Sequence, residues 1–153
     1  MRKHIPVVMA AILVLALATA ALSADDPFVG TWKLTKGGGN PPPKSLVYTI
    51  EARGSIHKMV TDRLDAEGKA THNESTRIID GKVHPMTNST LYDSSRATRV
   101  DANTVLNEFM KEGKVLRTLK SVVSKDGKVM MLTMKGKDAQ GKDFEGVDVL
   151  EKQ

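Results

Sequence analysis

The sequence predicts an all-β fold: an antiparallel up-and-down meander of eight to ten strands, closed into a barrel. Turn signals of the form x-Gly-Lys recur along the chain, and glycine supplies the positive φ that tight hairpin turns require. The segments between these turns alternate apolar and polar residues, as strands with one buried face do. Beyond the N-terminal apolar run, no window of helical length is free of a glycine or a turn cluster.

The N-terminus has the pattern of an export signal. Arg2 and Lys3 form a basic start, the run Ile5 to Leu22 is almost wholly apolar, and Ala24 precedes Asp25. This order predicts a signal peptide over residues 1–24, a barrel domain over residues 25–153, and a secreted or periplasmic location. No stable membrane insertion is expected after cleavage. The length of the apolar run leaves an uncleaved membrane anchor as the alternative.

Composition narrows the class of protein. The chain has no cysteine, so neither a disulfide framework nor a lipid-anchored N-terminus is expected. Without Arg2 and Lys3 the counts are 21 basic against 18 acidic residues, from 23 and 18 in the whole chain. These charges are interspersed, which argues against a nucleic-acid partner. A chain of this length can bury one adequate core, so a single domain is expected.

Five turn signals punctuate the region after the predicted signal peptide. They are Glu67-Gly68-Lys69, Asp80-Gly81-Lys82, Glu112-Gly113-Lys114, Asp126-Gly127-Lys128 and Gln140-Gly141-Lys142. Together with two intervening turn clusters they recur about every dozen residues, as in antiparallel sandwiches and barrels. We expect Gly81, Gly113 and Gly127 at turn tips. The segment 37–43 contains three glycines and three prolines and is expected to be a loop.

Ten β-rich runs lie between the turns. In order they are Val29–Lys36, Ser45–Ala52, Ile56–Leu64, Thr71–Ile79, Val83–Thr87, Arg96–Val100, Thr104–Met110, Val115–Ser124, Val129–Lys135 and Phe144–Glu151. Alternation is clear in the second run and in the ninth. It predicts that Leu46, Tyr48, Ile50 and Ala52 share one face, and that Met130, Leu132 and Met134 share another. Closure into a barrel would hide the two edges of so long a meander.

The third and fourth runs carry polar residues on both faces. His57, Arg63, His72, Glu74 and Arg77 interrupt the pattern there. Two interpretations stay open: these strands are exposed edges, or the inside of the sheet is partly polar, as a ligand cavity would make it.

Gly30 and Trp32 form a Gly-x-Trp motif on the first strand. The motif resembles that of the lipocalin-like, or calycin-type, barrels, and the turn-rich C-terminal part is similar in cadence to fatty-acid-binding proteins. The resemblance implies that Trp32 packs at one end of the barrel against an arginine near the end of the last strand. Because Phe144–Lys152 has no arginine, Arg117 is the candidate substitute. The Gly/Pro loop stands where the fatty-acid-binding proteins carry a helical lid.

Sequence motifs for chemistry are weak. The segment Gly136 to Asp143 matches seven positions of a phosphate-binding loop, but Asp143 replaces the Ser or Thr that holds magnesium, and no helix is predicted after it. A hairpin turn explains it better. His57, His72 and His84 show no local pairing, so no metal site is expected. No nucleophile elbow occurs. We therefore expect no catalytic residue and no cofactor.

The leading hypothesis is a binding module that holds a small apolar or amphipathic molecule inside the barrel. A structural or interaction protein with a filled core is the first alternative, and a small enzyme in a calycin-like cavity is the second. The sequence leaves the oligomeric state open. The expected lining residues are the apolar Tyr48, Ile50, Met130, Leu132 and Met134, with His57, Arg77 and Arg117 for a polar head group.

Overall fold

The computed structural model describes residues 26–38, 41–87, 89–137 and 141–153. The predicted signal peptide lies outside these residues. Ten strands are present: β1 (Gly30–Lys36), β2 (Ser45–Arg53), β3 (Ile56–Leu64), β4 (Ala70–Ile78), β5 (Val83–Pro85), β6 (Ser94–Asp101), β7 (Thr104–Lys111), β8 (Lys114–Val123), β9 (Val129–Lys137) and β10 (Asp143–Lys152). The described ranges contain no helix, and thus no helix long and apolar enough to cross a membrane.

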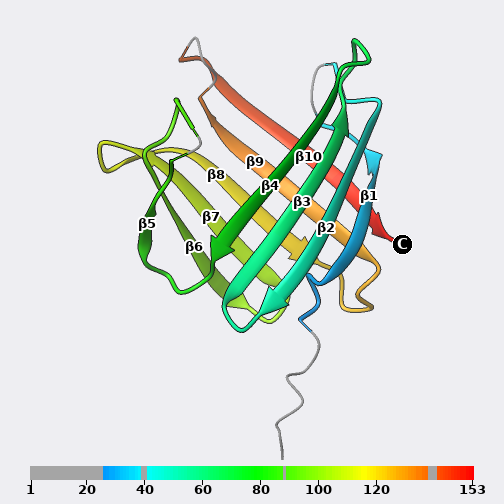
Figure 1. The fold of residues 1–153 in the computed structure, drawn as a ribbon, viewed down its shortest axis with the longest axis horizontal. Coiled ribbons are helices and arrows are strands. Elements are labelled where there is room, and N and C mark those ends of the chain that lie inside the picture. Colours follow the sequence, from blue (N-terminus) through cyan, green and yellow to red (C-terminus); the bar gives the residue numbers. More distant parts are fainter. Residues whose placement is uncertain (1–25, 39–40, 88, 138–140) are drawn as a thin grey trace, which may run out of the picture.

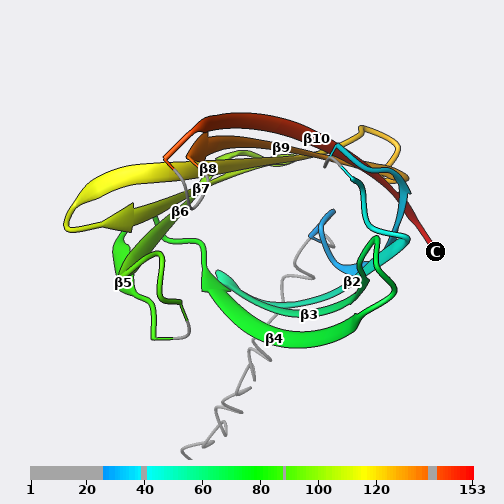
Figure 2. The ribbon, with the colours of Figure 1, turned by 90° about the horizontal axis from the view of Figure 1, so that it is seen from above.

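Each predicted run is a strand, and most boundaries shift by one or two residues. The fifth run is shorter than predicted, ending at Pro85 rather than Thr87, and β6 begins at Ser94 rather than Arg96. All neighbouring strands pair antiparallel, in the order β4-β3-β2-β1-β10-β9-β8-β7-β6-β5. The last strand thus pairs with the first, as Figures 1 and 2 show. The predicted all-β meander is confirmed.

The barrel is nearly closed. Strands β4 and β5 are the two ends of the sheet and form no ladder with each other. We call the gap between these two edge strands the seam. Near one end of the barrel the seam is bridged by the Gly81 N–H, which donates to the Ala97 carbonyl of β6 at 2.9 Å. Figure 2 shows the two curved walls, with β2–β4 in one and β6–β10 in the other.

The turn glycines adopt the predicted conformation. Gly81, Gly113 and Gly127 have φ values of 74°, 74° and 72°, in the left-handed region that side chains with a Cβ disfavour. At Gly113 and Gly127 a Cβ would meet nothing within 4 Å. Their requirement for glycine is therefore a matter of backbone conformation rather than space.

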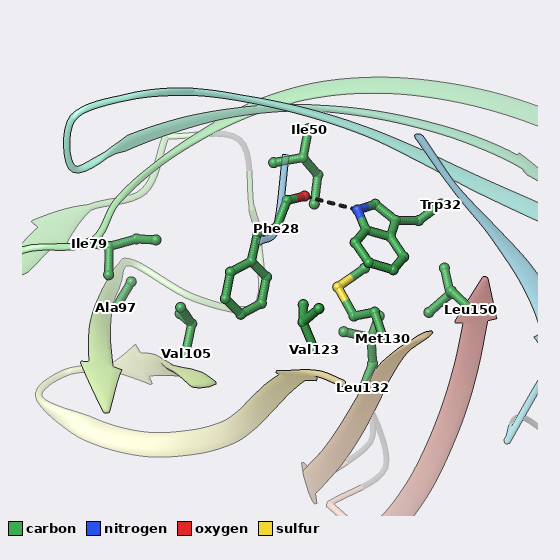
Figure 3. Packing of buried hydrophobic residues seen from close by; sticks show 10 residues of the cluster. All are labelled: Phe28, Trp32, Ile50, Ile79, Ala97, Val105, Val123, Met130, Leu132 and Leu150. Carbon is green, nitrogen blue, oxygen red and sulfur yellow. Dashed lines mark hydrogen bonds between the residues drawn. The ribbon is translucent and has the colours of Figure 1, made fainter. Parts of the chain in front are cut away.

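The two ends of the barrel differ. We call the end that holds the segment before β1 the floor, and the opposite end, where β1, β3, β7 and β9 end, the rim (Figure 1). A cluster of buried apolar side chains fills the floor half around Phe28 and Trp32 (Figure 3). Its members are Phe28, Trp32, Ile50, Ile79, Ala97, Val105, Val123, Met130, Leu132 and Leu150. Toward the rim several inward positions are partly or fully exposed, among them Tyr48, Arg63 and Asn73, although Leu46 beside Arg63 is buried.

Trp32 is fully buried at the floor, as predicted. Its indole Nε1 donates to the Phe28 carbonyl at 2.8 Å (Figure 3). The expectation that Arg117 packs on Trp32 is wrong: the Lys152 ammonium lies 5.2 Å from the centroid of the indole ring. Lys152 pairs with Trp32 across β1 and β10. Gly30 makes room for it, because a Cβ there would lie 2.7 Å from the Lys152 Cε.

Both interpretations of the polar third and fourth runs hold, in different places. β4 is an edge strand, and its first five residues are exposed. At the floor end of the same pair of strands, His57 is fully buried and Arg77 points inward beside it. The inside of the barrel is therefore partly polar.

Candidate functional site

The segment before β1 plugs the floor. Asp26 starts a tight turn in which its Oδ1 accepts from the Phe28 N–H at 3.0 Å and its carbonyl accepts from the Val29 N–H at 2.9 Å. This turn directs Phe28 into the barrel, where it is fully buried. Figure 2 shows the segment lying between the two walls. A side chain of this size, buried on all sides, fixes the floor by apolar packing.

A polar cluster links the segment before β1 to the strands on both sides of the seam. Asp26 Oδ2 lies 2.9 Å from His57 Nε2 on β3 and 2.5 Å from Arg99 Nη2 on β6. Arg77 Nη2 lies 3.2 Å from His57 Nδ1. Because a guanidinium only donates, Nδ1 accepts from Arg77 and the ring proton lies on Nε2, which donates to Asp26.

The charge states in this cluster follow from burial and partners. Burial works to raise the pKa of Asp26, but the Phe28 N–H, His57 and Arg99 together hold that pKa below its usual value. Burial lowers the pKa of His57, and Arg77 and Arg99 add to this against the effect of Asp26. Burial, helped by Arg99, lowers the pKa of Arg77 to about 10. At neutral pH the cluster is thus two cations, one carboxylate and a neutral imidazole.

This Asp–His pair is poorly arranged for acid–base chemistry. A general base must offer a free nitrogen to the proton that it removes. Both nitrogens of His57 are engaged, Nε2 by Asp26 and Nδ1 by Arg77. The cluster holds the floor and the seam together instead.

Toward the rim the inner face is apolar with isolated polar groups. Tyr48 and Leu119 pack against the core cluster and are partly buried, and Met134 is partly buried as well. Burial raises the pKa of the Tyr48 phenol, and the nearby Asp148 raises it further. The Asp148 Oδ1 accepts from the Gly38 N–H at 2.8 Å, which ties the β1–β2 connection to the barrel.

Arg117 is the inward cation nearest the rim on the β6–β10 wall. It lies 5.4 Å from the centroid of the Phe144 ring, and its Nη2 contacts the Met134 sulfur at 2.9 Å. In the sheet, Arg117 and Phe144 flank Gly136. Because Gly136 has no side chain, the guanidinium and the ring can meet across it. A thioether and an aromatic face are weak partners for a full positive charge.

Charges are segregated across the barrel wall. Arg63, Arg77, Arg99 and Arg117 lie on inward register positions, beside Leu46, His57, Val105 and Gly136 in turn. Strand carboxylates such as Glu51, Asp62, Glu74, Glu108 and Glu145 lie on the opposite register, and within the described strands Asp148 is the one inward exception. Among the described residues, the Nε atoms of Arg77 and Arg117 and the Oδ1 of Asn107 are buried without a hydrogen-bond partner. Buried polar atoms without a protein partner call for a specific explanation, such as a bound water, ion or ligand.

All eight predicted lining residues lie on inward positions, but not together. Ile50, Met130 and Leu132 are buried in the floor half, and His57 and Arg77 belong to the floor cluster. Tyr48, Arg117 and Met134 lie closer to the rim and are partly exposed. Sequence reasoning missed Asp26, Arg63, Arg99, Asn107, Phe144 and Asp148. The positions of Arg63, Arg99 and Asp148 at even spacing from apolar inward residues were the available signal.

The described residues hold no group of three or more His, Asp or Glu side chains placed to bind a metal ion. The hollows on the surface of the described residues include the following two. One, of about 550 Å³, lies at the rim where β8 and β9 separate. The other, of about 360 Å³, lies along β2, β3 and β4 and is lined by residues that include Val47, Asp62 and His72.

Comparisons with known proteins were made for sequence and for structure. No protein-family model matches the chain, and no curated protein matches its sequence significantly. Among solved structures, it is similar to a Schistosoma mansoni fatty acid binding protein in complex with arachidonic acid, with a TM-score of 0.62 and 12% identity over 84% of this chain and 97% of the other.

Two further structures are similar. Zebrafish ileal bile acid-binding protein complexed with cholic acid has a TM-score of 0.53 and 15% identity over 83% of this chain and 99% of the other. As-p18, an extracellular fatty acid binding protein, has a TM-score of 0.50 and 16% identity over 84% of this chain and 97% of the other. At these identities the likeness concerns the fold. The chain shares with these proteins the fold of a nearly closed antiparallel β-barrel, the architecture expected from the resemblance at Gly30 and Trp32.

Proposed function

We propose that the barrel binds a small amphipathic anion in its rim half and performs no chemistry on it. The observation that carries this proposal is the inward set of arginines on a face that excludes nearly all carboxylates. A buried cation without an acid is costly unless a ligand or solvent compensates it. An anionic head group beside Arg117, with an apolar tail along Tyr48, Leu119 and Met134, would satisfy both kinds of surface.

The structural neighbours support the same class of ligand. The two complexes contain arachidonic acid and cholic acid, and both molecules are amphipathic carboxylic acids. The filled floor half matters as well. It leaves the rim half, where inward residues reach solvent, as the region in which a small ligand would lie.

A matched pair of variants tests the proposal. Met134→Glu places a carboxylate beside Arg117, where it neutralises the cation and occupies the apolar lining. Met131→Glu, three residues earlier on the outward register and 46% exposed, is the control. Titration with an anilinonaphthalene sulfonate or a fluorescent fatty acid, followed by the probe and by Trp32, should show saturable binding that weakens about tenfold or more only in Met134→Glu.

The head group is tested by displacement. A long-chain carboxylate should displace the probe about tenfold more strongly than its methyl ester, because a charge-assisted hydrogen bond is lost in the ester. Equal displacement by acid and ester would remove Arg117 from the proposal. Absence of saturable binding across a broad panel of amphipathic anions would end it in favour of an interaction protein that acts through its surface. Turnover of a bound compound would favour the small-enzyme alternative.

We also propose that the protein is exported and cleaved after Ala24. The basic start, apolar run and small residue before Asp25 support this. Cleavage there would keep Asp26 and Phe28, which the floor requires, in the mature chain. Intact mass of the exported protein should correspond to a chain that begins at Asp25. A full-length product retained in the membrane would contradict it.

A further inference from the structure

We propose that the amphipathic anion reaches the inside of the barrel through a notch between β8 and β9 at the rim. The notch is the hollow of about 550 Å³ lined by Val115, Leu116, Lys135, Gly136, Lys137, Asp143, Phe144 and Glu145. This inference rests on the proposed function, because it names the passage by which that ligand arrives.

The notch exists because two strands separate before they end. The β8–β9 ladder runs from Val123 paired with Met130 to Arg117 paired with Gly136 and stops there. Beyond that point Lys114 and Val115 stay paired with β7, while Lys137 stays paired with β10. Figure 1 shows the tip of the β7–β8 hairpin diverging from the last residues of β9 and the first of β10, and Figure 2 shows the same divergence from above.

The notch is bordered by residues of both faces of the sheet. Along β10 its lining residues are Asp143, Phe144 and Glu145, which are consecutive and therefore point alternately out, in and out. Gly136 and Phe144 share the inward row of Arg117. The hollow is thus lined from both the outer and the inner face of the sheet.

The chemistry of the notch changes from outside to inside. On the outer face Lys135 pairs with Glu145 at 3.0 Å and Lys137 with Asp143 at 2.7 Å, all well exposed. The wall of the passage is apolar, with Val115 at 45% exposure, Leu116 and Phe144. Arg117 does not itself line the hollow but lies beside its lining residue Gly136 on the inner face, and its Nε has no hydrogen-bond partner among the described residues.

This order suits a molecule with one anionic end and an apolar body. The anion would leave water and form a charge-assisted hydrogen bond with Arg117. For Arg117, this bond is stronger than its contacts with the Met134 sulfur and the Phe144 ring. When Arg117 turns to the anion it leaves the Phe144 ring, and Phe144 then contacts the apolar body only while that body passes through the notch toward Tyr48, Leu119 and Met134. Gly136 is required for this geometry, because a Cβ there would lie 2.6 Å from the Leu116 carbonyl oxygen.

A blocking experiment tests the route. The chain contains no cysteine, so Val115→Cys creates a single thiol in the notch for a bulky maleimide. Val100→Cys, on β6 and 59% exposed at the parent residue, is the neutral control. Glu67→Cys, in the β3–β4 turn, places the same label on the open rim. Rates of binding and release of the anilinonaphthalene sulfonate would be measured by stopped flow through Trp32.

A passage affects both rates alike and leaves the equilibrium unchanged. In labelled Val115→Cys, association and dissociation should each slow about tenfold or more with a dissociation constant within about twofold of the parent. Labelled Val100→Cys and Glu67→Cys should keep the parent rates. Unchanged rates in labelled Val115→Cys, or slowing in Glu67→Cys instead, would overturn the notch as the route. A labelled Val115→Cys with weakened equilibrium binding and an unchanged association rate would also overturn it, because the notch would then be part of the bound site.

A second variant widens the passage. Phe144→Ala should speed association and release by a similar factor, and Phe144→Leu should change both much less. Failure of the unlabelled parent to bind any amphipathic anion is a separate result. It removes the proposed function itself and is seen before any labelled variant is measured.

Discussion

The floor and the rim of this barrel are built from the same strands but differ in side-chain burial and in the partners of their charged groups. At the floor, Phe28 and Trp32 are fully buried and the nearby charges compensate one another through Asp26. At the rim, Arg117 has only a thioether and an aromatic ring as close partners, and inward side chains reach solvent. The difference teaches that stability is concentrated at one end, which leaves the other free to carry a cation without a carboxylate partner, as the proposed ligand site requires.

The largest expected effect is at the floor. Trp32→Ala should lower the free energy of unfolding by about 3–5 kcal/mol, because it opens a cavity in a packed cluster. Met134→Ala, near the rim and partly exposed, should cost clearly less. Urea unfolding followed by far-UV circular dichroism measures both. Equal costs would contradict the contrast between the two ends. In the parent protein, Trp32 emission should be blue-shifted, and emission typical of a solvated indole would refute its burial.

The next effect separates two Asp–His pairs. Asp26→Asn should cost about 2–3 kcal/mol, because it leaves Arg77, Arg99 and His57 facing one another without an acid, and the carboxylate is only 16% exposed. Asp62→Asn breaks the exposed pair with His72 and should change stability far less. Denaturant midpoints of the two variants make the comparison. If Asp26→Asn proved as mild as Asp62→Asn, the floor cluster would not hold the seam.

Replacing a turn glycine should lower the free energy of unfolding by a similar amount at both ends. Gly127 lies in the β8–β9 turn at the floor and Gly113 in the β7–β8 turn at the rim, and a Cβ would touch nothing at either place. Replacing either one with Ala or Val should cost about 1 kcal/mol or more, since only the positive φ is at stake. A much larger cost at Gly127 would mean that packing of the floor extends into its turns.

Lowering the pH should lower the free energy of unfolding through the titrating groups at the floor. Burial holds the pKa of His57 below 6.5, so below pH 6.5 the unfolded chain binds more protons than the folded one and stability falls as pH falls. Asp26 acts in the same direction at lower pH, because its pKa lies below 3.8 when folded and its contribution is lost as pH falls through that folded value. Urea midpoints at pH 7.5 and pH 5 should differ, and His57→Gln should flatten the difference.

His72 provides the opposite control for that measurement. Its hydrogen bond to Asp62 raises the pKa of His72 above 6.5, so its contribution is present at low pH and is lost as pH rises through the folded pKa. His72→Gln should therefore steepen the loss of stability toward acid. If His57→Gln and His72→Gln changed the slope in the same sense, the assignment of neutral His57 to the floor would be wrong.

The sequence by itself determined the local features of this protein. The x-Gly-Lys turns predicted the φ of Gly81, Gly113 and Gly127, and alternation predicted the inward face of Tyr48 and Ile50, because turn conformation and strand pleat depend on neighbours in the chain. The motif at Gly30 and Trp32 pointed to the barrel and to a buried indole. All eight expected lining residues lie on inward positions for the same reason.

Only the tertiary structure decided which of these groups meet. Asp26 contacts Arg99 across 73 positions of sequence, and Lys152 rather than Arg117 lies on Trp32, because barrel closure fixes partners that no local pattern encodes. The inward residues divide into a buried floor half and a partly exposed rim half because the segment at Phe28 folds back into one end. The notch depends on where the β8–β9 ladder stops. The residue pattern of one strand does not determine where its pairing with the neighbouring strand ends.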